Sequence, residues 1–156
     1  MTSANEPSPS LPSGRVVLQA MFGRASSHQL THPLLAAAAE LVRLATRAAD
    51  DEVSKARVGQ MRRIDSYVDH VLPIPVESAV LHTETVSMVL VRMADHAASL
   101  GRPVDIDRLS AVWGPLDELV RGLDALTDDL LAGRRRVPLS IWWNTRPDLI
   151  PLQEKR

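Results

Sequence analysis

Ionisable side chains with a spacing suited to chemistry gather in the block "LHTET" and in the helix expected after it. His82 and Glu84 lie two positions apart, and such a pair can act as proton acceptor and orienting group at the mouth of a helix. Arg92 and His96 are four residues apart, so a helix would place both on one face. An arginine and a histidine turned toward a cavity would suit an anionic ligand. We therefore take both histidines and the glutamate as candidate catalytic groups, and Arg92 as a candidate substrate-binding group.

A structural interpretation of the same residues is equally concrete. Thr83 or Thr85 can cap the helix that follows, which would explain the "LHTET" block by capping alone. Arg92 and His96 border the apolar stripe of that helix, so they lie either on the surface or beside the core. The two interpretations differ in whether these side chains border a common cavity.

Other polar residues give weaker signals. His28 and His32 have a spacing that can hold a metal on a helix, but Pro33 follows and no third ligand is near, so we expect no metal site. His70 lies at the expected end of a helix, where it can offset the helix dipole, as can the arginines of "GRRR" at 133–136. The sequence holds no glycine-rich nucleotide-binding motif, no zinc-protease motif and no cysteine, and no cofactor is expected.

Composition limits the class of protein. The chain of 156 residues predicts one domain, with 18 basic and 19 acidic side chains and a net charge of -1. This balance disfavours binding to nucleic acid, which needs an excess of cations. The first fourteen residues are polar and rich in proline, and lack the basic and apolar parts of a secretory signal. No apolar run is long enough to cross a membrane, so we expect a cytoplasmic protein without membrane contact.

Apolar residues that recur every three or four positions predict four amphipathic helices. The expected spans are 33–48, 58–71, 85–100 and 105–133. Thr31 is the expected N-cap of the first helix, while 49–57 is either a hinge or a continuation into the second. Pro115 is expected to kink the last helix, because a proline removes a backbone hydrogen bond.

Four such helices with short links predict an all-α fold, an antiparallel four-helix bundle. Residues 1–14 are expected to be a disordered tail and 15–156 a single helical domain, in which 15–22 form a helical turn or a strap. No alternation of apolar and polar residues indicates a strand. Trp142 and Trp143 are expected in a C-terminal strap folded over the bundle, or as anchors for a second protein subunit or a second copy of the chain.

Three blocks of the sequence resemble an uncharacterised bacterial family of small helical proteins, domain-of-unknown-function family 4254. They are "HPLLAAAAELVRL", "LHTETVSMVLVRM" and "LLAGRRRVPLSIWWNTRPDLIP", and the resemblance runs from about residue 30 to the end. Residues 82–85 and Arg92 match the family's blocks one by one, and Asn144 matches the asparagine of its tail. The resemblance therefore adds Asn144 to the candidate substrate-binding residues.

The chain departs from this family at several positions. Val86 and Ser87 stand where the family has proline and glycine, and Val91 replaces an acidic residue. A Trp-His-x-Glu-Asp stretch of the first helix reads Ala-Asp-Asp-Glu-Val at 49–53, which keeps only Glu52. The chain thus resembles a diverged member.

The chain is also similar in size and composition to the small subunit of the two-protein enzymes that close aziridine rings in azinomycin-type antibiotic biosynthesis. This resemblance implies intramolecular attack of an amine on carbon with loss of sulfate, and hence a small anionic substrate. It implies proton acceptance by His82, Glu84 or His96 and sulfate binding by Arg92, with 134–136 as further candidates. The sequence thus leaves two functions open, an enzyme subunit acting with a partner and a non-catalytic interaction or scaffold protein.

Overall fold

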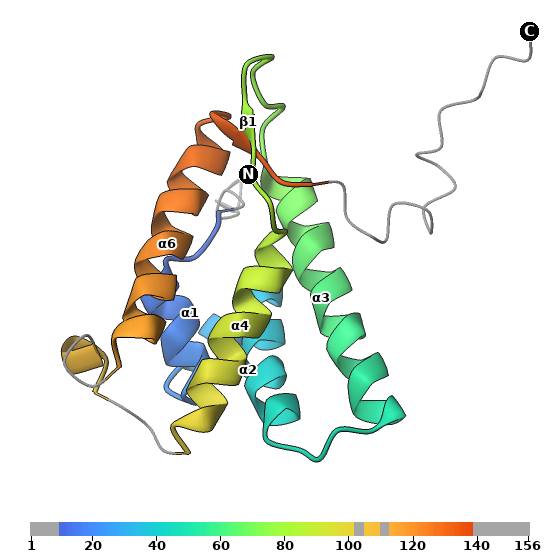
Figure 1. The fold of residues 1–156 in the computed structure, drawn as a ribbon, viewed down its shortest axis with the longest axis vertical. Helices are drawn as coiled ribbons and strands as arrows, with labels where there is room; N and C mark the ends of the chain where they lie inside the picture. The colour runs from blue at the N-terminus through green and yellow to red at the C-terminus, as the bar shows by residue number, and fades with distance from the viewer. Residues whose placement is uncertain (1–9, 102–104, 110–112, 139–156) are drawn as a thin grey trace, which may run out of the picture.

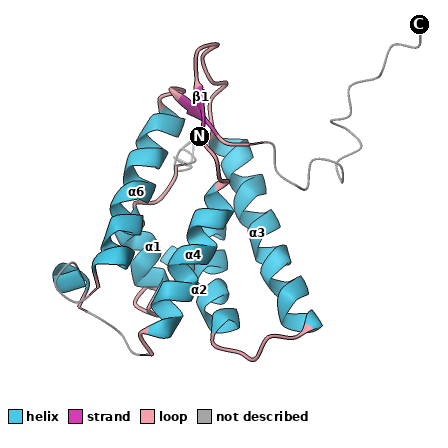
Figure 2. Cartoon of the chain, viewed as in Figure 1, coloured by secondary structure: helices cyan, strands magenta, loops and turns pink. Residues whose placement is uncertain are grey.

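The computed structural model describes residues 10–101, 105–109 and 113–138, and these residues are mostly helical (Figures 1 and 2). The five described α-helices are α1 Gly14–Met21, α2 Pro33–Ala45, α3 Asp51–Val71, α4 Val86–Ser99 and α6 Gly114–Leu131. Short 3-10 helices are η1 Gln29–Thr31 and η2 Ile106–Arg108, and the two strands are β1 Val80–Leu81 and β2 Arg135–Arg136. The mostly helical class is confirmed, whereas the small sheet was not predicted.

The helices α2 and α3 form an antiparallel hairpin across a short turn. The N-cap of α2 is His32, whose Nδ1 accepts from the amide of Leu34 at 3.2 Å, so the prediction of Thr31 as cap is wrong by one residue. Asp50 caps α3 by accepting from the amide of Val53 at 2.7 Å. Residues 51–57 therefore belong to the helix and are not a hinge.

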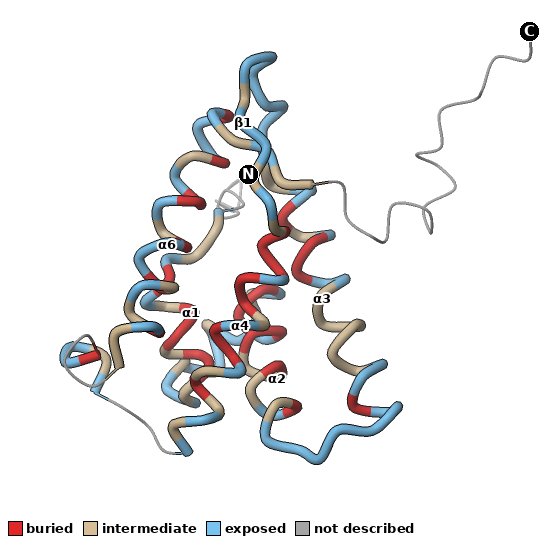
Figure 3. Tube along the Cα trace, viewed as in Figure 1, coloured by how far each residue is buried: buried red, intermediate tan, exposed pale blue. Residues whose placement is uncertain are grey.

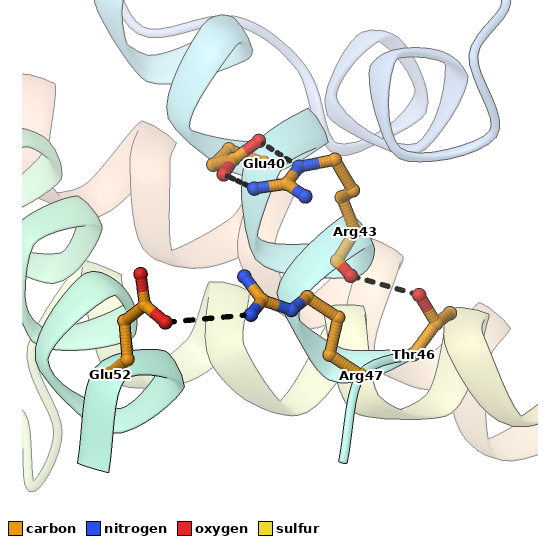
Figure 4. Close-up of polar contacts among 5 residues, drawn as sticks. All are labelled: Glu40, Arg43, Thr46, Arg47 and Glu52. Carbon is orange, nitrogen blue, oxygen red and sulfur yellow. Dashed lines mark hydrogen bonds and ion pairs between the residues drawn. The ribbon is translucent and has the colours of Figure 1, made fainter. Parts of the chain in front are cut away.

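Ion pairs hold the outer side of this turn (Figure 4). Across the turn, Nη2 of Arg47 lies 3.9 Å from Oε2 of Glu52. Within α2, Arg43 forms an ion pair with Glu40. The hydroxyl of Thr46 donates to the carbonyl of Arg43 at 2.8 Å and closes the end of α2. Glu52, which the predicted resemblance sets against the glutamate of a Trp-His-x-Glu-Asp stretch, has 84% of its side chain exposed and therefore lies on the surface.

The core lies between α1, α2, α4 and the inner faces of α3 and α6, where buried positions face one another (Figure 3). The predicted apolar stripes supply most of it. Fully buried members include Leu41, Ile64, Leu90, Met93, Leu116 and Leu130. The helix periodicity was therefore sufficient to predict which faces of α2, α3, α4 and α6 are buried.

The helix α1 is an addition to the four predicted helices and packs against both α2 and α6. Ser13 caps it by accepting from the amide of Val16 at 3.3 Å. Gly14 is its first residue, so the helical part of the chain begins before residue 15, while 1–9 lie outside the described residues. The amide of Gly14 donates to Oδ1 of Asp124 at 2.6 Å, and a Cβ there would lie 2.6 Å from the carbonyl oxygen of Val120. Only glycine allows this approach of α1 to α6.

The last predicted helix is not a continuous helix with a kink. Within the described residues, Asp105 caps the short helix η2, and α6 begins separately at Gly114. Pro115 lies in the first turn of α6, where the missing amide hydrogen has no intrahelical partner to lose. The proline therefore starts a helix instead of bending one.

The parallel strands β1 and β2 join the segment before α4 to the segment after α6. Val80 pairs with Arg135 and Leu81 with Arg136. The amide of His82 then donates to the carbonyl of Arg136 at 2.8 Å. Gly133 makes the required turn with φ of 69°, a value that favours glycine. Two sequence blocks separated by about fifty residues thus become neighbours.

None of the helices in the described ranges is long and apolar enough to cross a membrane. The predicted strap with Trp142 and Trp143 lies outside the described residues.

The contact at Gly14 predicts that two Gly→Ala substitutions act in opposite directions. Gly14→Ala should lower the free energy of unfolding by about 1–3 kcal/mol, because the new methyl group overpacks the α1–α6 contact. Gly59→Ala, within α3 and with open space around it, should raise that free energy by up to about 1 kcal/mol through helix propensity. Urea denaturation of both variants measures the difference. Equal effects of the two substitutions would contradict a tight α1–α6 contact.

Candidate functional site

Three of the predicted site residues meet at the start of α4. Nη1 of Arg92 donates to Oε2 of Glu84 at 2.9 Å, from the second turn of α4 back to the residue before its cap. Nδ1 of His82 lies 2.8 Å from the carbonyl oxygen of Glu84 and 3.2 Å from its amide nitrogen. We call His82, Glu84 and Arg92 the polar cluster.

The chemistry open to His82 depends on its tautomer. If Nδ1 carries the proton, it donates to the carbonyl of Glu84, and Nε2 is then free to accept a proton. If Nδ1 is unprotonated, it accepts from the amide of Glu84, and Nε2 is a donor. The shorter distance to the carbonyl favours the first arrangement, in which His82 can act as a base.

The sheet brings the arginines that follow α6 to the polar cluster. His82 lines a cavity of about 120 Å³ together with Gly122, Ala125, Leu126, Asp129 and Arg135. Asp129 accepts from Nε of Arg134 and Nε of Arg135, both at 2.9 Å. These hydrogen bonds, that of Arg134 foremost, hold the pKa of the Asp129 carboxyl below its usual range. The cavity is therefore lined by an ionised carboxylate that pairs with two arginines and balances one of their two positive charges.

Asp129 was missed in the sequence, although a signal was present. It stands five and six residues before Arg134 and Arg135, at a helix end where the chain must turn back. The prediction that these arginines offset the helix dipole considered only the backbone. The nearest strong acceptor for them is this side chain.

His96 and Asn144 do not join the cluster in the described structure. The ring of His96 packs edge-on against Trp113, with centroids 5.3 Å apart and an interplanar angle of 77°. The cavity that His82 lines includes none of His96, Glu84 and Arg92, so the four predicted residues do not share that cavity. Asn144 lies outside the described residues.

The two early histidines have structural roles. His32 caps α2 through Nδ1, and its Nε2 lies 3.2 Å from the carbonyl of Ser10. The carbonyl of His28 accepts from the hydroxyl of Thr31 at 2.7 Å. Across the described ranges, no group of three or more side chains of the ligating types is placed to hold a metal ion.

A buried network that the sequence did not predict fixes the start of α4. Ser87 donates its amide to Oδ1 of Asp65 at 3.1 Å and its hydroxyl to Oδ2 at 2.8 Å. The hydroxyl of Thr85 lies 2.9 Å from the hydroxyl of Ser87. It also accepts from the amide of Met88 and so caps α4. Because Ser87 gives its single hydroxyl proton to Asp65, Thr85 is the donor between the two hydroxyls. Ser87, where the resemblance expected glycine, thus binds α4 to α3.

Burial governs the charge of Asp65, whose exposed fraction is 6%. Loss of hydration raises the pKa of its carboxyl above the ordinary value of 3.8. Hydrogen bonds from Ser87 lower this pKa in part, and the charge of Asp69 raises it further. The ionised form is therefore less favourable in the folded protein than in the unfolded chain.

Comparison of the chain with family models, with curated proteins and with solved structures gives no match. The family and the activity that the sequence resembles therefore stay predictions.

The raised pKa of Asp65 predicts a pH-dependent effect of Asp65→Asn. A folded-state pKa above the unfolded value means that this group stabilises the fold fully below about pH 3.8 and loses that contribution as pH rises through its folded pKa. An asparagine can still accept from the Ser87 amide through Oδ1, and its Nδ2 can donate to the Ser87 hydroxyl, so both contacts can form without a charge. The unfolding free energy of Asp65→Asn, relative to the unmodified chain, should therefore increase from pH 3 to pH 7 in denaturant titrations.

Asp65→Ala serves as the matched variant. It leaves the buried amide and hydroxyl of Ser87 without their acceptor, which should cost about 1–3 kcal/mol. A difference between Asp65→Asn and the unmodified chain that stays flat with pH would show that the carboxyl is not strained by burial.

Proposed function

We propose that this chain is a small helical subunit of a heteromeric enzyme complex in natural-product biosynthesis. The observation that carries the proposal is a group of exposed apolar side chains beside the polar cluster, which gives a partner protein a surface to cover. The resemblance to the aziridine-forming two-protein enzymes and to the diverged family supplies the biosynthetic setting. The complex is expected to be cytoplasmic and to need no metal or cofactor.

The exposed apolar side chains lie in the segment between α3 and α4, which projects beyond the helix ends in Figure 1. We call Ile74, Val76, Val80 and Leu81 the apolar end. Ile74 is 95% exposed and Val80 is 61% exposed, while Val76 and Leu81 are about half exposed. Clustered apolar surface in water costs free energy that binding recovers, so such a patch indicates an interaction site. The pairing of β1 with β2 holds this surface in place.

Trp142 and Trp143 follow β2 closely in the sequence. Either they form the predicted strap over the helices, or they bind the partner. We favour the partner role, since the segment leading to them starts beside the apolar end. Tryptophan is enriched among the residues that dominate binding energy at protein interfaces.

In the catalytic version of the proposal, the chain contributes to aziridine closure at the polar cluster. An amine nitrogen of the substrate attacks the carbon that bears the sulfate, the carbon–oxygen bond breaks, and sulfate leaves. His82 accepts the proton released by the amine, and Glu84 holds its ring through the backbone contact. Arg92 binds the anionic leaving group, and Arg135, which lines the cavity of His82, is a second candidate for this contact.

A non-catalytic interaction or scaffold protein is the second candidate, and a specific observation favours it. Arg92 already forms an ion pair with Glu84, and Asp129 already binds Arg134 and Arg135. His96 lies against Trp113, apart from the cavity that His82 lines. A surface whose charges pair with one another binds a small anion less readily than one with open cations. In this version the chain only positions a partner.

Arg92→Ala separates the two versions. The side chain of Arg92 is 54% exposed, so its loss should change the unfolding free energy by less than about 1 kcal/mol. In the catalytic version, turnover by the complex with its partner should fall about 100-fold or more, because a positioned donor to the leaving group is lost. Arg57→Ala removes a comparable surface pair to Asp95 and is the control. Unchanged turnover by Arg92→Ala would leave only the scaffold version.

The apolar end predicts that the isolated chain self-associates. Light scattering of the full chain should show a concentration-dependent rise in mean mass, and the Ile74→Ser, Val76→Ser double variant should reduce it. Leu30→Ser, at an exposed apolar position elsewhere, should not. A stable monomer at high concentration, with indole fluorescence typical of buried rings, would argue against partner dependence.

A further inference from the structure

A second site lies on the hairpin of α2 and α3, away from every residue used above for function. It is an open groove of about 610 Å³ between the first turn of α2 and the second half of α3. Its lining residues are Pro33, Ala36, Arg62, Arg63, Ser66, Tyr67 and His70.

The lining of this groove is basic. Two arginines and a histidine contribute to it, and no carboxylate is among the lining residues. Most arginines on the described surface pair with an acidic neighbour, as Arg57 does with Asp95. Arg63 is exposed and has no ion pair within the described ranges. The groove therefore presents at least one cation that is not neutralised by the protein, on a chain whose net charge is close to zero.

The geometry of the groove suits an anion attached to an organic group. The start of α2 at Pro33 adds the positive end of a helix dipole to the arginine side chains. The hydroxyl of Ser66 and the ring of His70 can donate hydrogen bonds from the α3 side. Ala36 and the ring of Tyr67 supply apolar surface, and the volume exceeds what a bare ion needs.

Tyr67 is held in one orientation, which gives the groove a defined wall. Its ring packs edge-on against His32, with centroids 4.8 Å apart, and its hydroxyl donates to the carbonyl of Ser10 at 3.2 Å. His32 also contacts that carbonyl and caps α2. The aromatic wall of the groove is thus already in place before any ligand binds.

We propose that this groove binds a small organic molecule through a phosphate or sulfate group. Arg63 is the main contact to the tetrahedral anion, because its planar guanidinium can donate two parallel hydrogen bonds. Ser66 and His70 complete the anion contacts, and the organic part lies over Ala36 and Tyr67. The proposal does not depend on the function proposed for the apolar end and the polar cluster.

Titration of the full chain followed by amide resonances in NMR tests this site. The probes are inorganic phosphate, inorganic sulfate and phenyl phosphate, each at constant ionic strength in chloride. Saturable shifts are expected at the amides of residues 34–36 and 62–70, with phenyl phosphate binding more tightly than inorganic phosphate because its ring has apolar surface to cover. Phosphate and sulfate arms of the titration distinguish the two anions.

Arg63→Gln should weaken phenyl phosphate binding about tenfold. Lys55→Gln is the matched control, since it removes one exposed positive charge from the same helix outside the groove. Ala36→Glu, at an exposed position of α2, places a carboxylate in the groove and should abolish binding. Circular dichroism confirms that each variant folds. Equal losses in Arg63→Gln and Lys55→Gln, or shifts that do not saturate, would overturn the proposal.

Discussion

The contact between the Asp65 carboxylate and Ser87 is the constraint on which the rest of the functional end depends. It places a charged group in the interior, at the first turn of α4, and matches it with two donors and the positive end of the helix. If the carboxylate stayed buried but lost one of these hydrogen bonds, the free-energy cost of its burial would exceed the stabilisation from the bond that remained. The start of α4 therefore has little freedom to slide along α3. The residues just before α4 are held in place as a result.

This fixed start determines where the polar cluster and β1 lie. His82 and Glu84 come immediately before the Thr85 cap, so their backbone direction follows from the cap geometry. The same segment then meets β2, which is itself anchored by the turn at Gly133. Two short strands of this length would not be stable alone. They persist because both ends are tied to helices that the core already orders.

The apolar periodicity predicted α2, α3 and α4 and the inner faces of these helices, since burial repeats with the helix turn. It could not predict the α1–α6 contact, which rests on the absence of one Cβ at Gly14 and on Asp124, far away in the sequence. Pro115 was read as a kink because a proline fits both the interior of a bent helix and the first turn of a new one. The strands β1 and β2 have too few residues to show an alternation, and their pairing joins distant segments.

The candidate site shows the same division between local and distant information. The contact of the His82 ring with the backbone of Glu84 joins residues two positions apart, so the sequence could predict that they are neighbours. The spacing of Arg92 and His96 correctly predicted a shared helix face, yet Arg92 binds Glu84 and His96 packs on Trp113. Helix spacing says which side chains are neighbours, but not which acceptor a cation chooses. Asp129, which binds the two arginines just after its own helix, shows that a nearby carboxylate outside the helix repeat can be the chosen acceptor.

The pairing of these charges bears on any chemistry at the polar cluster. The ion pair of Arg92 with Glu84 is largely in contact with water, where such pairs are weak and exchange readily. A partner protein that covered the apolar end would also exclude water from this neighbouring surface. In a drier environment the interaction of Arg92 with an anion would be stronger. Under the proposed function, docking at the apolar end and chemistry at the partly buried polar cluster would thus be linked, because docking would remove water from both.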